Sequence, residues 1–176
     1  MAGVSLAPKI RMLKAEVKET LLYGCAAWSM KVQHGSKLRT IHHRLLLRCV
    51  GSHKRKRTDN MMSHQSTIDR TECETVEMTV RKRRLLLAGC IVRMNASRLP
   101  KQIMSGHIIT EGKTEGVGGG GGRKRWMACL KDDLRKWDGA GGRAADKFAW
   151  KNMIEEGAEK FMAMWMAKEQ ALRDTR

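Results

Sequence analysis

Apolar residues recur at helical spacing from the start of the chain. Leu6, Ile10, Leu13, Val17 and Leu21 follow one another at steps of three or four residues, which places them on one face of a helix. Such a face packs against a core while the polar residues between its members face solvent. The spacing therefore predicts an N-terminal amphipathic helix with one buried seam.

Two aromatic residues follow this helix. Tyr23 and Trp28 come directly after the apolar seam. We therefore expect them to be packing anchors rather than platforms for stacked bases.

A second helix is predicted over 36–50, and Gly51 suits its C-terminal cap. Its expected seam has four members, namely Leu38, Ile41, Leu45 and Cys49. Three cations line one flank, namely Lys37, Arg44 and Arg48. A basic ridge beside a buried seam allows a helix to lie along a phosphate backbone while it is packed from behind.

Residues 51–58 are polar and show no periodicity, which predicts an exposed loop. The loop carries a run of four cations, namely Lys54, Arg55, Lys56 and Arg57. Such a run fits a phosphate contact or a nuclear-import signal, although short basic runs also arise by chance in a cationic chain. A short helix is expected over 59–67.

The longest helical pattern lies between Thr71 and Lys101. Thr71 and Glu74 have the spacing of a capping box, and Asn95 is a suitable stop. The expected buried stripe contains Cys73, Val76, Val80, Leu87, Cys90, Ile91 and Met94. Leu85 lies on the opposite side, so contacts on two faces are expected. Four consecutive cations, Arg81, Lys82, Arg83 and Arg84, face anions in one interpretation and are only solvated in the other.

A turn and short helix are predicted at 98–104, before a nearly pure glycine tract at 116–122. Three cations and an aromatic residue follow this tract, namely Arg123, Lys124, Arg125 and Trp126. They could grip a nucleic-acid strand by charge and stacking, or Trp126 could be the first core residue of a helix that runs to Trp137. A last amphipathic helix carries Trp150, Ile154, Ala158, Phe161, Trp165 and Leu172 on one stripe.

Composition supports a mainly α fold, because the chain has only 2 prolines and few aromatic or β-branched runs. We expect a basic helical region over 1–110, a glycine-rich linker over 111–122 and a helical C-terminal segment over 123–176. Lys and Arg number 35 against 18 Asp and Glu, a net charge of +17. Residues 1–110 carry 21 basic and 7 acidic side chains, so a polyanionic partner is expected mainly there.

The sequence predicts no catalytic chemistry. It has no paired carboxylates in an apolar setting and no Ser-His-Asp or Cys-His signature. Asp132 and Asp133 point apart on a helix, so we expect solvated acids rather than a metal site. Cys49 and His53 have a ligand-like gap without a second pair, so neither metal nor cofactor is expected. The five dispersed cysteines and the lack of a signal peptide or membrane span favour a nuclear or cytoplasmic protein that is not secreted.

Several landmarks together resemble the C-terminal thumb and post-thumb region of non-LTR (LINE-type) retrotransposon reverse transcriptases. Residues 21–28, LLYGCAAW, resemble the family's LLYG-x-E-x-W segment. Residues 83–94, RRLLLAGCIVRM, resemble RRLRWLGHVLRM, and residues 122–129 resemble GRPRKRW-xx-C. Ala26 and Cys90 stand where the family has Glu and His. The catalytic YADD-type palm strand is not in these 176 residues, so the resemblance implies no polymerase activity.

The resemblance implies a thumb-like helical bundle that clamps template-primer RNA or DNA through backbone phosphates. A reverse-transcriptase palm acting in trans is the further partner that it implies, and no membrane is expected. The alternatives are a helical protein-interaction or structural remnant that uses its Met- and Trp-rich C-terminal helix, and a non-functional relic of a transposable element. The expected nucleic-acid contacts are Lys37, Arg44, Arg48, Lys54, Arg55, Lys56, Arg57, Arg81, Lys82, Arg83, Arg84, Arg93, Arg123, Lys124, Arg125 and Trp126.

Overall fold

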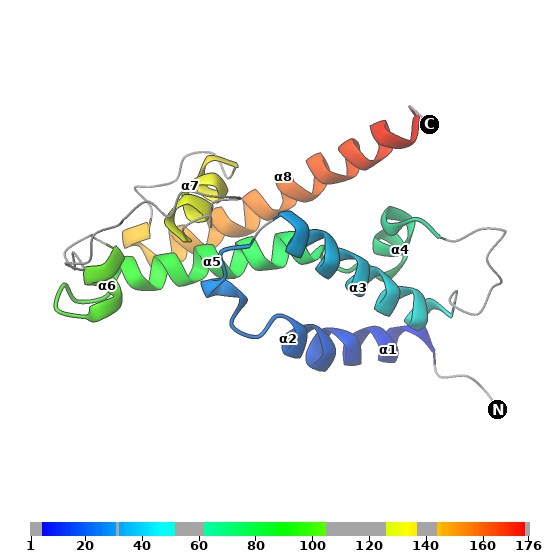
Figure 1. Ribbon diagram of the computed structural model, residues 1–176, viewed down its shortest axis with the longest axis horizontal. Coiled ribbons are helices and arrows are strands. Elements are labelled where there is room, and N and C mark those ends of the chain that lie inside the picture. Colours follow the sequence, from blue (N-terminus) through cyan, green and yellow to red (C-terminus); the bar gives the residue numbers. More distant parts are fainter. Residues whose placement is uncertain (1–4, 31, 52–61, 105–125, 137–143, 175–176) are drawn as a thin grey trace, which may run out of the picture. The chain divides into compact units, whose positions relative to one another are not determined.

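The computed structural model describes residues 5–30, 32–51, 62–104, 126–136 and 144–174 (Figure 1). These residues are mainly helical, which confirms the predicted fold class, and the described ranges contain no strand. The α-helices are, in chain order, α1 (Leu6–Met12), α2 (Lys18–Leu21), α3 (Val32–Val50), α4 (His64–Thr71), α5 (Val76–Val92), α6 (Leu99–Met104), α7 (Trp126–Lys136) and α8 (Lys147–Asp174).

The chain divides into two compact units, and two of its helices contribute to both. Where described, unit 1 contains Met1–Cys25, Val32–Val80 and Lys160–Arg176, and unit 2 contains Ala26–Lys31 and Arg81–Glu159. α5 and α8 therefore each supply one part to unit 1 and the other to unit 2. The expected linker lies outside the described residues, so the division of the chain at 111–122 stays a prediction.

A π-helical turn, Leu13–Val17, joins α1 to α2 and changes which residues are buried. Ile10 and Leu13 are buried, as the spacing predicts. Because a π turn winds more residues per turn than an α-helix, the buried face then moves along the chain. Lys18 and Leu22 are buried, while Val17 is 38% exposed. The prediction of one seam running through Val17 was therefore wrong beyond Leu13.

The aromatic prediction was wrong for one of its two residues. Tyr23 is 84% exposed, whereas its neighbour Leu22 is fully buried. The chain turns here at Gly24, whose φ of 65° lies in the left-handed region that glycine adopts without strain. Trp28 is half-buried.

α3 begins at Val32, earlier than predicted, and ends where expected. Gly51 has a φ of 83°, and its N–H donates to the carbonyl of Arg48 at 3.2 Å. Of the predicted seam, Leu45 and Cys49 pack against the core of unit 1 as expected, while Ile41 does not belong to it. His42 and Leu46 are buried, whereas Ile41 is 43% exposed. The prediction was wrong at Ile41, because His42 takes the buried place expected for it.

α4 starts later than the sequence suggested. Its cap is Ser63, whose Oγ accepts a hydrogen bond from the N–H of Ser66 at 3.1 Å. The expected start at Asp59 lies outside the described residues, and the described helix runs from His64 to Thr71 rather than ending at Thr67.

The predicted capping box at Thr71 was wrong, because that hydroxyl is used inside α4. Thr71 Oγ1 donates to the carbonyl of Thr67 at 2.7 Å. Glu72 has a φ of 49° and ends α4. The actual cap of α5 is Thr75, whose Oγ1 accepts from the N–H of Met78 at 3.3 Å. The pattern was therefore two helices rather than one.

α5 makes contacts on two faces, as expected. Leu85, on one side, is fully buried, and so is Val76 on the other, while Cys90 is exposed and does not belong to the stripe predicted for it. The helix ends at Val92, before Asn95, whose Oδ1 instead accepts from the N–H of Ser97 at 3.1 Å. α6 follows at the place predicted.

Each unit has its own packing centre. In unit 1 the core cluster contains Ile10, Leu13, Leu46, Ile68, Cys73 and Trp165. In unit 2 the orange part of α8 runs beside α5 (Figure 1), where Trp150 Nε1 donates to the carbonyl of Leu85 at 2.9 Å. A Cβ added at Gly89 would overlap Nε1 and Cδ1 of Trp150. Glycine at this position therefore permits the close approach of the two helices.

The stripe predicted for the last helix is confirmed for its described members. Trp150, Ile154, Ala158 and Trp165 are buried, and Phe161 is half-buried and packs against the core of unit 1. No helix in the described ranges is long and apolar enough to cross a membrane.

Candidate nucleic-acid interface

The central cations of α5 lie among acids of the same chain. Arg84 is 4% exposed, and its Nη1 donates to the Asp133 carboxylate of α7. Its Nη2 donates to the carbonyl of Trp28 at 3.0 Å. Arg81 Nε lies 3.3 Å from the same Asp133 carboxylate. Asp133 therefore pairs with two arginines of the run. Arg84 contacts both α7, through Asp133, and the segment that contains Trp28.

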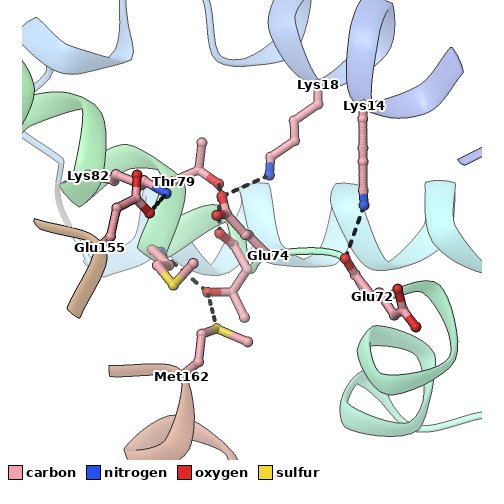
Figure 2. Close-up of polar contacts among 10 residues, drawn as sticks. Lys14, Lys18, Glu72, Glu74, Thr79, Lys82, Glu155 and Met162 are labelled. Carbon is pink, nitrogen blue, oxygen red and sulfur yellow. Dashed lines mark hydrogen bonds and ion pairs between the residues drawn. The ribbon is translucent and has the colours of Figure 1, made fainter. Parts of the chain in front are cut away.

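The second residue of the run has an acid of its own. Lys82 Nζ and Glu155 Oε2 of α8 are 2.5 Å apart, a contact visible in Figure 2. Lys82 is 20% exposed and Glu155 is 48% exposed, so solvent screens this pair more than the Arg84 pair. Arg83 is half-buried. Arg84 is thus neither solvated nor available to an external anion, which were the two interpretations of this run.

The expectation that Asp133 is a solvated acid was wrong. Asp133 is 4% exposed, whereas Asp132 next to it pairs with the exposed Arg135 at 3.8 Å. The helical spacing could have shown the difference, because Asp133 lies four residues after Cys129 and three after Leu130, on the buried face of α7. An acid on an apolar stripe needs a buried cation, and the sequence did not show which one.

Two further expected contacts have partners within unit 2. Arg93 Nη1 donates to the carbonyl of Ala144 at 2.9 Å. Trp126 is half-buried, and its Nε1 donates to the carbonyl of Ala26 at 2.8 Å. The N–H of Trp126 is thus satisfied by a backbone carbonyl of unit 2, and a contact of its ring with nucleic acid stays a prediction.

The cations of α3 have different surroundings. Lys37, Arg44 and Arg48 are all exposed. Their spacing of seven and four residues places them on one face of the helix, and Ile41, between them, is 43% exposed. The opposite face, with His42 and Leu46, is buried. This exposed face, here called the α3 ridge (Lys37, Arg44 and Arg48), is the largest group of expected contact residues that the described structure leaves accessible.

The remaining expected contacts lie outside the described residues. They are Lys54, Arg55, Lys56, Arg57, Arg123, Lys124 and Arg125. Their contribution stays a prediction.

Unit 1 also contains a groove of opposite charge. Its volume is about 400 Å³, and it is lined by Ile68, Asp69, Glu72, Cys73, Glu74, Met162 and Met166. Figure 2 shows its polar side, where Lys18 pairs with Glu74 at 3.7 Å and Lys14 donates to the carbonyl of Glu72 at 3.0 Å. Because carboxylates repel phosphates, this groove is not suited to a nucleic-acid backbone.

Comparison with protein-family models, curated proteins and solved structures found no match. Among the described residues no group of three or more His, Cys, Asp and Glu side chains could hold a metal ion.

Proposed function

We propose that this chain binds nucleic acid through backbone phosphates, as a C-terminal fragment of a retrotransposon reverse transcriptase that lacks the polymerase active site. The observation that carries the proposal is the α3 ridge, where three cations share one exposed helix face. The net charge of +17 adds a long-range attraction for polyanions. The resemblance to the thumb region supports a template-primer clamp.

The geometry of the ridge suits a backbone contact. At a rise of about 1.5 Å per residue, Lys37 and Arg44 are roughly 10 Å apart along the axis, and Arg44 and Arg48 roughly 6 Å. Cations in such a row can meet successive phosphates of one strand without contacting base edges. We therefore expect affinity without sequence preference.

The experiment is fluorescence-polarisation binding to an RNA–DNA hybrid across a salt series. The test variant combines Lys37→Gln, Arg44→Gln and Arg48→Gln. Log affinity should fall with log salt by about 0.9 per phosphate contact on duplex DNA, so loss of three contacts should lower the slope by about 2.7. The parent chain should bind tightly at low salt and weaken steeply.

A matched control separates the ridge from net charge. Lys151→Gln, Arg70→Gln and Arg98→Gln remove one lysine and two arginines, all exposed and outside the ridge. This control should keep the parent's salt slope. Equal binding by the ridge variant and the control would overturn the role of the ridge, and a flat salt dependence of the parent chain would overturn the proposed function.

Protein interaction is a second candidate function, and the groove of unit 1 favours it. Met162 and Met166 are flexible, polarisable side chains that adapt to a partner, and they lie beside the acids Asp69 and Glu72. A partner segment with a long apolar side chain flanked by Lys or Arg would fit. A concentration-dependent complex that Met166→Glu abolishes, together with no binding of nucleic acid by the parent chain, would support this function instead.

A further inference from the structure

Three imidazoles meet where α4 packs on α3. His42 and His43 belong to α3, and His64 is the first residue of α4. The ring centroids of His43 and His64 are 5.0 Å apart, and Trp165 of α8 contacts the His64 ring edge-on at 5.3 Å. His43 Nε2 lies 3.3 Å from Thr67 Oγ1 of α4. This imidazole cluster (His42, His43 and His64) therefore lies between three helices of unit 1.

Four ring nitrogens of the cluster are buried without a hydrogen-bond partner in the described structure. They are Nδ1 and Nε2 of His42 and of His64. His42 is 1% exposed. A neutral imidazole loses hydrogen bonds in such a place, but a charged one loses far more, because an ion is solvated much more strongly than a dipole.

The charges around His42 also oppose its protonation. Burial lowers its pKa to about 4, with further lowering by Lys18 of α2 and by the other two imidazoles. Lys18 itself is 8% exposed, and its acid is Glu74 at 3.7 Å. Protonated His42 would thus be a second buried cation next to Lys18.

The surroundings of His64 also oppose its protonation. Burial lowers its pKa to about 4, and His43 and Arg39 of α3 lower it further. Arg39 Nε in turn pairs with Glu77 Oε1 of α5 at 2.6 Å. Burial lowers the pKa of His43 as well, partly offset by a backbone hydrogen bond to Met62.

We propose that the imidazole cluster is a proton-operated latch, which holds α4 against α3 and α8 while its rings are neutral and releases α4 when they are protonated. The proposal rests on the packing of three rings at one helix junction, where the charged side chains that act on them in the described structure, Lys18 and Arg39, are cations. It is independent of nucleic-acid binding.

The pH window follows from linkage. The ordinary pKa of an imidazole, 6.5, applies in the unfolded chain, and burial lowers the pKa of His42 and of His64 to about 4 in the folded chain. The stabilisation is therefore complete above pH 6.5 and is lost as the pH falls towards 4. Within this window each of the two rings should raise the unfolding equilibrium constant by up to about tenfold for every unit by which the pH falls.

Urea unfolding of the full chain at a series of pH values tests the latch. In the parent, the unfolding equilibrium constant should rise by up to about 100-fold for every unit by which the pH falls. His42→Leu or His64→Leu should reduce this rise to about tenfold per unit. His34→Gln is the matched control, because His34 is an exposed imidazole of α3 outside the cluster. It should leave the pH dependence of the parent unchanged.

Amide hydrogen exchange locates the opening. After correction for the intrinsic exchange rate, α4 should lose protection in this window before α7 does. NMR titration of the ring protons measures the pKa values of the imidazoles in the parent chain. This test needs no substitution, so it does not depend on the folding of a variant. Titration of both His42 and His64 near 6.5, or equal protection of α4 across the window, would overturn the latch.

Discussion

Two groups of cations were both expected to contact nucleic acid, and the structure gives them different surroundings. Arg81 to Arg84 form the densest cationic run of the described residues, yet Arg84 is 4% exposed and bound to Asp133. Lys37, Arg44 and Arg48 are spread along α3, and all three are exposed. A consecutive run places its members on every side of a helix, so some must face the core, whereas a spacing of seven and four keeps them on one side. Periodicity is thus a better guide to an accessible basic surface than density.

The largest expected effect on stability concerns the buried pair of Arg84 and Asp133. Asp133→Ala would leave Arg84 buried without a counter-charge, which should lower the free energy of unfolding by about 3–5 kcal/mol. Asp132→Ala is the control, because this neighbouring acid pairs with an arginine that is 79% exposed, and we expect less than about 1 kcal/mol. Urea unfolding of both variants measures the difference, and equal losses would contradict the structural role of Asp133.

A smaller effect is expected where α8 approaches α5. In Gly89→Ala the new methyl group would overlap Trp150, so the free energy of unfolding should fall by about 1–3 kcal/mol. Adding Trp150→Phe should recover part of the loss, because it removes Nε1, one of the two Trp150 atoms that the methyl group would overlap. A double-mutant cycle measures this coupling, and strictly additive effects would contradict the close packing.

The smallest effect on stability is expected at the α3 ridge. The three Gln substitutions at Lys37, Arg44 and Arg48 remove exposed charges, so the free energy of unfolding should change by no more than about 0.5 kcal/mol each. Thermal unfolding beside the binding assay tests this. A large loss of stability would mean that the ridge packs against another part of the chain, and any loss of binding would then be indirect.

Much of the helical order could be predicted from spacing. The positions of α6 and α8, the C-terminal cap at Gly51 and the second buried face of α5 at Leu85 all follow from apolar periodicity and local backbone preference. The seam beyond Leu13 could not be predicted, because the π turn is a local change of winding that the spacing does not reveal. The candidate site was predicted in part. The ridge on α3 is accessible as expected. The role of Asp133 could not be predicted, because the sequence does not show that α7 packs against α5.

By itself, the sequence determined the helical class, the excess of cations and which of them lie on one face of α3, because these depend on residue type and on a repeat of a few residues. Only the tertiary structure decided which cations remain available. Arg84, Arg93 and Lys82 have partners 49, 51 and 73 residues away in the chain, and no local pattern encodes such a pairing. The same is true of the imidazole cluster, since burial of His42 depends on the helices that pack around α3.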